Sequence, residues 1–213
     1  MALSLIGLPV LKVAANGFAL PDQDAFATAR GEAVTATADN PSAIYYNPAG
    51  ITQLDGNNLR AGMYFLDYHI NFKPPSSAPN AGKTYDEDNN FAAIPRFFYT
   101  YTTTNMPLSF GLGVYAPFGG KIGWPQDTGF RAVALNGELT YLTVNPVVAW
   151  KICPSLSIAA GPMVNYVKLK TDQGLRPFSQ PLINYFRFNG SGWSVGYNLG
   201  IRWQPLEQLS FGA

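Results

Sequence analysis

Apolar side chains alternate with small or polar ones over most of the chain from Asn57 onward. A period of two indicates β-strands whose two faces have different surroundings, because successive side chains of a strand point to opposite faces. The clearest alternation covers residues 193–204, where Trp, Val, Tyr, Leu, Ile and Trp hold the odd positions. The pattern predicts six strands and the opening of a seventh, at about 58–73, 91–103, 107–117, 138–152, 156–170, 193–204 and 209–213.

The composition favours lipid as the surroundings of one face. Charged residues make up 13% of the chain, about half of the typical share of roughly 25%. The chain has no apolar run of the ~18 residues that a transmembrane helix needs. Aromatic residues at both ends of an aliphatic centre, such as Trp193 and Trp203, are typical of the interfacial girdles of membrane barrels. The predicted fold class is therefore all-β, an antiparallel transmembrane β-barrel.

The connections between the predicted strands alternate in length. Long polar or Gly/Pro-rich stretches cover residues 74–90, 118–137 and 171–191, whereas short turns lie near 104–106, 153–155 and 205–208. Outer-membrane barrels have long loops outside and short turns in the periplasm. Because such barrels have an even number of strands, eight at least, we expect residues 57–213 to supply about half of a barrel and the chain to be the N-terminal part of a longer protein.

Three prolines fall on the apolar sets of the predicted strands. Pro95, Pro146 and Pro162 each remove a donor from the backbone ladder. We therefore expect bulges or local breaks at these positions.

Residues 1–56 differ from the strands. Residues 2–11 are apolar and Val13-Ala14-Ala15 is a small-residue site, so residues 1–15 are predicted to be a signal peptide. No Lys or Arg precedes the apolar run, which means that the start lies upstream or the segment is atypical, and a buried first strand or helix is the alternative. Residues 16–56 contain two Asn-Pro steps, at Asn40-Pro41 and Asn47-Pro48, which predict a tightly turned plug.

The order of these features resembles the long-chain fatty-acid and hydrocarbon transporters of the outer membrane, the FadL and TodX type. The resemblance lies in the mature start at residues 16–20, the Asn47-Pro48-Ala49 motif within the plug, residues 113–119 with Trp124 downstream, residues 144–146 and residues 192–200. It implies a 14-stranded monomeric barrel, multi-pass in the bacterial outer membrane, with an N-terminal hatch at 16–56 that plugs the lumen. Hydrophobic compounds, either fatty acids or alkylbenzenes, would cross by passive diffusion.

The resemblance also implies a path. Ligand is captured between extracellular loops, moves to a site near the hatch and mature N-terminus, and leaves sideways through an opening at an inward kink in the third strand. By position, Asn47, Pro48 and Ala49 form the hatch motif, which gates the path or only seats the plug. Gly17 and Phe18 lie near the site. Gly111 and Gly113 are candidates for the kink, with packing against the hatch as the alternative.

Several residues on the predicted inward face suit a hydrophobic guest. An apolar patch inside a barrel lets such a molecule shed water, which contributes ~25 cal/mol per Å² buried. The candidates for the ligand path are Met63, Phe65, Phe98 and Met163, with Val147 on the same face. Candidates for binding a carboxylate headgroup are His69, which lies beside Asp67, and the basic residues Arg96, Lys151 and Arg202. The alternatives are that His69 and Asp67 are only solvated near the end of their strand, and that the three basic residues pair with carboxylates such as Asp39 or Glu32.

The chain is poorly supplied for catalysis or metal binding. Cys153 is the single cysteine and His69 the single histidine, so an internal disulfide, a cysteine metal cluster and a catalytic site are not expected, and no cofactor is predicted. A lipid hydrolase would need a Ser-His-acid arrangement, and no G-x-S-x-G motif lies near His69. A net charge of +1 offers no basic patch for nucleic acid.

Two further interpretations concern the surface. An adhesin or structural barrel that binds through its long loops is the alternative function. Lys168 and Lys170, near the outer end of the fifth predicted strand, are expected to contact solvent or lipopolysaccharide.

Overall fold

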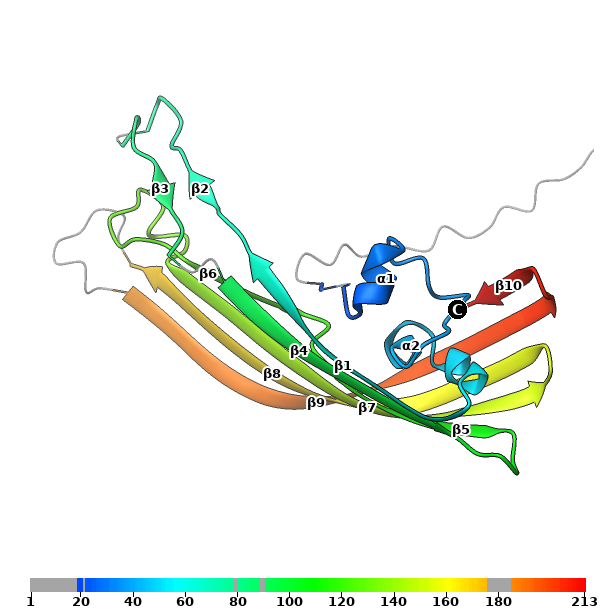
Figure 1. Cartoon of the computed structure of the whole chain (residues 1–213). Coiled ribbons are helices and arrows are strands. Elements are labelled where there is room, and N and C mark those ends of the chain that lie inside the picture. Colours follow the sequence, from blue (N-terminus) through cyan, green and yellow to red (C-terminus); the bar gives the residue numbers. More distant parts are fainter. Residues whose placement is uncertain (1–18, 21, 79, 89–90, 176–184) are drawn as a thin grey trace, which may run out of the picture.

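The structure is a computed structural model that describes residues 19–20, 22–78, 80–88, 91–175 and 185–213. It consists of one strongly curved antiparallel sheet with the N-terminal segment, residues 22–54, on its concave side (Figure 1). The predicted signal peptide and two of the predicted site residues, Gly17 and Phe18, lie outside the described residues.

The main sheet has the strand order β1-β4-β5-β7-β8-β9-β10, with β6 paired to β7. A separate ribbon of β2 and β3 extends beyond one end of the sheet (Figure 1). The strand bounds are β1 Gly56–Asp67, β2 Asn71–Phe72, β3 Tyr85–Asp86, β4 Phe91–Thr102, β5 Leu108–Tyr115, β6 Gly119–Gly123, β7 Asn136–Cys153, β8 Leu156–Gly174, β9 Tyr185–Leu206 and β10 Leu209–Gly212. The sheet curls into a half-barrel, which confirms the predicted fold class.

The ends of several strands differ from the prediction, and β6 lies within the predicted loop 118–137. β1 ends at Asp67 instead of continuing to 73, whereas β8 and β9 run into the predicted loop 171–191. The hydropathy pattern ends where the apolar residues end, but backbone pairing continues through polar residues, as Asp172 pairs with Arg187. We call the end of the sheet near Asp172 the long-loop end, and the opposite end the short-turn end.

The two faces of the sheet have different side chains. Directly paired residues of an antiparallel sheet share a face, so the continuous registers of β7, β8 and β9 assign the faces together. The convex face carries exposed apolar residues, among them Leu142, Trp150, Ile158, Trp193 and Val195. The concave face carries small or polar residues that are buried, among them Thr143, Asn145, Ser157, Ala159 and Asn165.

The three prolines all lie on the convex face. Pro95 pairs with Met63 and Pro162 pairs with Tyr197, without a shift of register. Between β7 and β8 the ladder stops after Val144 and resumes in the same register at Val148, which places Pro146 opposite Pro162. The Asn145 side chain donates a hydrogen bond of 2.9 Å to the Pro162 carbonyl oxygen. The strand pairing between β7 and β8 is thus interrupted at Pro146 without a bulge, and the Asn145 side chain supplies a hydrogen-bond donor there.

The N-terminal segment contains three short helices: α1 Ala25–Ala29, α2 Ala43–Tyr46 and the 3₁₀ helix η1 Pro48–Gln53. Buried apolar residues of this segment pack against the concave face to form a hydrophobic core, made of Ala38, Ala43, Ile44, Ala49, Ile51, Phe98, Tyr115, Val147, Ala149 and Ala159. Among the described residues, no helix is long and apolar enough to cross a membrane.

Candidate functional site

The candidate site is the contact between the N-terminal segment and the concave face of the sheet. Asn47 lies at its centre and is buried. The Asn47 side-chain nitrogen donates to the Thr35 carbonyl at 2.8 Å and to the Ile201 carbonyl of β9 at 2.9 Å. Its oxygen accepts a hydrogen bond from the Ala49 backbone N–H at 3.2 Å, which caps η1 where Pro48 holds the first position. The Asn47 side chain therefore caps η1 and also binds it to β9 of the main sheet, which we call the wall.

Glycines on the wall allow this close approach. A Cβ atom added to Gly200 would lie 2.5 Å from the Asn47 side-chain oxygen, and one added to Gly212 would lie 2.2 Å from the Thr35 carbonyl oxygen. Sequence reasoning assigned no role to either glycine. For Gly200, the sequence signal that could have indicated a close contact was the run of small residues at the even positions of 192–200.

Gly111 and Gly113 are also on the concave face. Added Cβ atoms there would lie within 3.0 Å of the Ile44 side chain. Both glycines pair regularly with β4 and β7: Gly111 with Thr100 and Val147, and Gly113 with Phe98 and Asn145. Their contacts fit the alternative of packing against the N-terminal segment, and neither lies at an interruption of the strand.

A buried polar network joins the segment to three strands. Asn198 of β9 donates to the Ile44 carbonyl at 2.7 Å and to the Asn145 side-chain oxygen at 3.0 Å. The Tyr115 hydroxyl donates to the same oxygen at 3.1 Å. Nearer the short-turn end, the Thr52 and Ser157 hydroxyls are 2.8 Å apart. Sequence reasoning placed Asn145, Asn198 and Ser157 on the polar sets but assigned them no contact, because their partners are backbone groups and residues far away in sequence.

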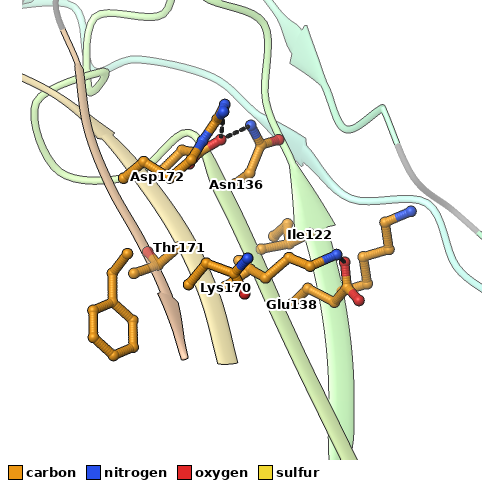
Figure 2. Close-up of a pocket in the computed structure, with 11 residues that line it drawn as sticks. Ile122, Asn136, Glu138, Lys170, Thr171 and Asp172 are labelled. Atoms are coloured by element: carbon orange, nitrogen blue, oxygen red, sulfur yellow. Dashed lines mark hydrogen bonds and ion pairs between the residues drawn. The ribbon is translucent and has the colours of Figure 1, made fainter. Parts of the chain in front are cut away.

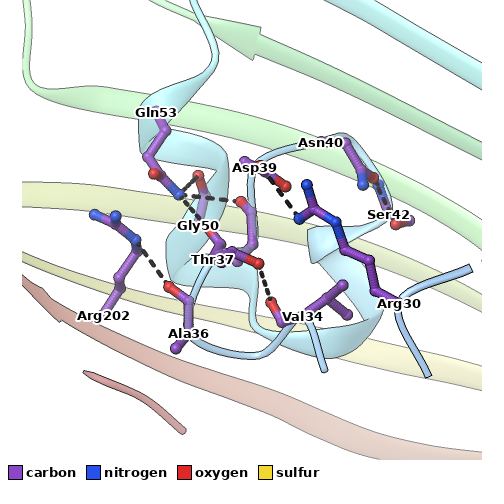
Figure 3. Close-up of polar contacts among 11 residues, drawn as sticks. Arg30, Val34, Ala36, Thr37, Asp39, Asn40, Ser42, Gly50, Gln53 and Arg202 are labelled. Atoms are coloured by element: carbon purple, nitrogen blue, oxygen red, sulfur yellow. Dashed lines mark hydrogen bonds and ion pairs between the residues drawn. The ribbon is translucent and has the colours of Figure 1, made fainter. Parts of the chain in front are cut away.

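Basic residues of the wall hold the rim of the segment. Arg60 of β1 forms an ion pair with Asp24, and Arg96 of β4 donates to the Asp22 carbonyl. Arg202 of β9 donates to the Ala36 carbonyl at 3.3 Å (Figure 3). Arg96 and Arg202 thus bind the N-terminal segment through carbonyl oxygens instead of the carboxylates of Asp39 or Glu32. The Asp39 carboxylate instead forms an ion pair with the Arg30 guanidinium, 3.6 Å away, within the segment (Figure 3).

The prediction for the faces of the first strand was wrong. Met63 and Phe65 lie on the convex face with exposed fractions of 48% and 61%, opposite to the predicted inward orientation. The inward set is the one that contains Arg60 and Tyr64, whose side chains reach Asp24 and Asp22. Both alternate sets of this strand are largely apolar, so hydropathy alone did not distinguish them.

The other predicted path and headgroup residues lie in different environments. Phe98 and Met163 are on the concave face as predicted: Phe98 is buried in the core, and the Met163 sulfur is 3.8 Å from the Tyr115 hydroxyl. Lys151 shares the concave face by its pairing with Ser157, but it is exposed near the short-turn end. His69 lies beyond the end of β1, and its exposed ring is 4.0 Å from Asp67. The structure therefore does not gather the four headgroup candidates into one site.

The third wall strand is interrupted between β5 and β6. Tyr115 pairs with Thr143, and Gly119 pairs with Thr140, so three residues, 116–118, lie opposite only two of β7. One extra residue on a strand is a β-bulge, which bends the strand and disrupts the ladder. Residues at the start of the described chain contact this point. The Leu20 N–H, just before the N-terminal segment, donates to the Pro117 carbonyl at 2.8 Å, and the Gln23 side-chain amide, within the segment, donates to the Ala116 carbonyl at 2.9 Å.

The interruption leaves part of β4 without a neighbour on one side. Residues 97–102 of β4 pair with β5, but within the described chain residues 91–96 pair with β1 alone. β6 pairs with β7 and not with β4. A gap in backbone pairing therefore lies between β6 and the long-loop half of β4, beside Ala116, Pro117 and Phe118. The sequence analysis placed its kink candidates at Gly111 and Gly113, which lie in the regularly paired part of β5.

One acidic residue of the N-terminal segment, Glu32, has a shifted pKa. Burial raises the pKa of the Glu32 carboxyl above 4.5, and the nearby Asp22 and Asp24 carboxylates act in the same direction, while a hydrogen bond with Tyr46 opposes the shift. Glu32 also has a positive φ of 63°. In the described part of the chain, no group of three or more His, Cys, Asp or Glu residues could hold a metal ion.

These features can be compared with known proteins. The family model for outer membrane protein transport proteins, OMPP1/FadL/TodX, matches residues 10–213. The chain belongs to the FadL/TodX family. It is therefore a multi-pass protein of the outer membrane.

Relatives of the FadL/TodX family show how much of the fold is present. The outer membrane protein NMB0088 of Neisseria meningitidis serogroup B is 29% identical over 124 residues, which cover 56% of this chain and 26% of the relative. A Pseudomonas aeruginosa FadL homologue has a TM-score of 0.71 at 17% identity, with 92% of this chain and 52% of that chain covered. The Ralstonia pickettii toluene transporter TbuX has a TM-score of 0.65 at 16% identity, with 81% and 51% covered. The chain thus spans about half the length of these solved structures and about a quarter of the curated relative.

Proposed function

We propose that the protein is a passive transporter of hydrophobic compounds across the outer membrane, with residues 16–56 as a hatch that plugs the lumen. The observation that carries this proposal is the position of the N-terminal segment, which covers the concave side of the half-barrel and contacts the wall where β5 is interrupted. A polar substrate would need an open aqueous lumen. A hydrophobic compound can instead leave through a gap in the wall, because the gap leads to lipid.

The path begins at the long-loop end. Phe130 there contacts Phe72, Tyr85 and Trp124, with ring centroids 4.7, 6.3 and 5.2 Å away. Aromatic groups in loops outside the membrane are suited to capture a greasy molecule from water. The ligand then moves toward the N-terminal segment, past Phe98 and Met163 on the concave face, and diffuses sideways between β4 and β6. Asn47, Pro48 and Ala49 keep the hatch seated during this passage.

The substrate class is long-chain fatty acids or aromatic hydrocarbons. Of the headgroup candidates, Arg96 lies beside the gap on the concave face, where its guanidinium can bind a carboxylate. His69, Lys151 and Arg202 lie elsewhere and are not proposed for this role. The convex face contacts outer-membrane lipid and lipopolysaccharide, and one copy of the full-length chain forms the barrel as a monomer.

Deletion of Pro117 tests the path. The deletion removes the extra residue, so that two residues of the strand oppose two of β7, and β6 can continue the β5 register alongside β4. We expect uptake of labelled oleate or toluene by cells that produce the full-length deletion variant to fall to the background of cells without the protein.

The control is deletion of Ser77, an exposed residue of the loop between β2 and β3, which should leave uptake unchanged. Equal amounts of folded protein in the outer membrane must be verified for both variants. Uptake by the Pro117 deletion at the wild-type rate would reject the lateral path. Wild-type uptake no faster than background would reject the transport function itself.

A further inference from the structure

A charged patch lies on the convex face at the long-loop end of β6, β7, β8 and β9. Convex-facing positions can be followed up the strands as paired rows. Tyr166 pairs with Trp193, and the two rings are 5.1 Å apart. The next row contains Lys168, and the row beyond it contains Lys170 paired with Glu138, which pairs in turn with Lys121. The last row joins Asp172 to Arg187.

The change from apolar to charged side chains is abrupt. Convex positions nearer the middle of the sheet are apolar, such as Leu142, Val164 and Val195. Two residues of a strand advance by about 7 Å, so Lys168 lies about one row beyond the aromatic pair and Lys170 about two rows beyond it. Tyr and Trp are enriched at the level of lipid headgroups. The patch therefore lies just outside the acyl chains, where the phosphates of the outer leaflet are found.

The charges of the patch are unbalanced. Lys121, Lys168, Lys170 and Arg187 carry four positive charges, and Glu138 and Asp172 carry two negative ones. Two of the cations are neutralised: Lys170 is 3.1 Å from Glu138, and Arg187 is 2.8 Å from Asp172 (Figure 2). In the part of the chain that the structure describes, no carboxylate forms an ion pair with Lys121 or Lys168.

A pocket of about 320 Å³ lies along this patch. It is lined by Lys121, Glu138, Lys170, Asp172 and Arg187 together with Asn136, Asn189 and neighbouring residues (Figure 2). The Asn136 amide donates to Asp172 at 3.2 Å, which adds to the contacts that hold this carboxylate beside Arg187. The ion pairs of Lys170 and Arg187 hold the charged side chains that line the pocket. Lys121 also lines the pocket, and Lys168 lies one row closer to the apolar part of the convex face, so both lysines remain available to an anion from the lipid leaflet.

We propose that this patch is a binding site for the phosphate groups of lipopolysaccharide, with Lys121 and Lys168 as the residues that bind them and Tyr166 and Trp193 against the acyl chains. The proposal rests on the contact with outer-membrane lipid proposed above and not on the transported compound. Hydrogen bonds between ammonium groups and phosphate are about twice as strong as neutral ones. A bound lipid would hold β6 against β7 beside the interrupted part of the wall.

The test uses the full-length protein, purified in detergent and freed of lipid, with binding measured by native mass spectrometry. The probes are bisphosphorylated lipid A, dephosphorylated lipid A and inorganic phosphate. The test variant is Lys121→Gln with Lys168→Gln. The matched control is Lys73→Gln with Lys83→Gln, which changes the charge equally at exposed loop positions of the same end of the molecule.

Each lysine near an anionic lipid surface contributes a factor of about five in affinity. We expect the double variant to bind bisphosphorylated lipid A about 25-fold more weakly than the wild type, and the control to bind it equally well. Equal binding by the double variant and the wild type would overturn the proposal. So would equal binding of dephosphorylated lipid A, or binding of inorganic phosphate as tight as that of lipid A.

An uptake assay on the same variants separates this proposal from the proposed function. If the wild type binds bisphosphorylated lipid A as expected but takes up neither oleate nor toluene, the transport function fails and the lipid site stands. If it takes up both while the double variant binds lipid A normally, the lipid site fails and the transport function stands.

Discussion

At the scale of single residues, the contact between the N-terminal segment and the wall depends on small side chains opposite a buried amide. Asn47 has its donors and acceptor satisfied by Thr35, Ile201 and Ala49. This arrangement leaves no room for a side chain on Gly200. Protein interiors are packed so closely that one added methyl group at such a point must displace its neighbours.

Gly200→Ala is expected to lower the free energy of unfolding by about 1–3 kcal/mol, the usual cost of overpacking a close contact. The added Cβ would be 2.5 Å from the Asn47 oxygen and 2.8 Å from the Pro48 ring. Gly192→Ala is the matched control, because it lies on the same strand and an added Cβ would meet nothing within 4 Å. Urea unfolding of the refolded full-length variants in detergent measures the difference. A Gly192 variant destabilised as much as the Gly200 variant would contradict the explanation.

Glu32→Gln is expected to stabilise the N-terminal segment at neutral pH and to have no effect well below pH 4.5. The folded protein raises the pKa of Glu32, so it binds the proton more tightly than the unfolded chain does. The associated stability is present below the unfolded pKa of about 4.5 and is lost as the pH rises through the higher folded pKa.

Proteolysis of the N-terminal segment at a series of pH values measures this effect. The amide cannot ionise, so the variant should lose the pH dependence between the two pKa values. Glu207→Gln, at an exposed turn, is the control and should follow the wild type. An unchanged pH profile in the Glu32 variant would show that this carboxyl does not control docking.

At the scale of elements, sequence reasoning succeeded where one alternate set of a strand is apolar and the other is not. β7, β8 and β9 meet this condition, and their predicted faces are confirmed by the continuous registers. It failed for β1, where Met63 and Phe65 on one set are balanced by Tyr64 and Leu66 on the other. The contacts of Arg60 with Asp24 and of Tyr64 with Asp22, residues 36 and 42 positions earlier, distinguish the two faces.

The ends and interruptions of the strands also could not be predicted from the sequence. The bulge at residues 116–118 depends on the register of β7 against both β5 and β6, and no local residue pattern specifies that difference. The glycines at 111 and 113 are local signals for weak strands, yet their small size serves packing against Ile44. The site residues could be predicted by their type and face, but their partners could not, because most partners are backbone carbonyls distant in sequence.

Asn145→Ala is expected to lower the free energy of unfolding by about 1–3 kcal/mol, because buried groups that lose their partner pay the cost of desolvation. Asn145 links β7 to Tyr115 of β5, to the Pro162 carbonyl of β8 and to Asn198 of β9. Asn71→Ala, at an exposed position of β2, should change the stability by less than about 0.5 kcal/mol. The midpoint of urea unfolding of the full-length protein measures both. Equal midpoints for the two variants would show that the network contributes nothing at the proline break.

At the scale of the whole molecule, the distribution of exposed apolar residues decides between lipid and water as surroundings. The convex face bears Trp193, Val195, Tyr197 and Leu199 on a single strand, each more than 60% exposed. Such a surface in water would aggregate. In a bilayer this surface is the favourable outer wall of a barrel. A large exposed fraction on the convex face therefore means contact with lipid, whereas the same exposed fraction in a loop means contact with water.

Two valines with nearly equal exposed fractions test whether the convex face contacts lipid. Val195 on the convex face is 78% exposed and Val133 in the loop before β7 is 77% exposed. A surface in water tolerates Val→Arg at both positions. If the convex face lies in lipid, Val195→Arg should destabilise the full-length protein by about 1–2 kcal/mol, because Val195 lies one row inside the aromatic residue Trp193 and the cost of Arg on the lipid face falls from ~2–4 kcal/mol at the bilayer midplane to ~0–1 kcal/mol near the interface. Val133→Arg should stay within about 0.5 kcal/mol of the wild type. Urea unfolding in phospholipid vesicles measures both changes, and similar small effects would mean that Val195 does not face the hydrocarbon.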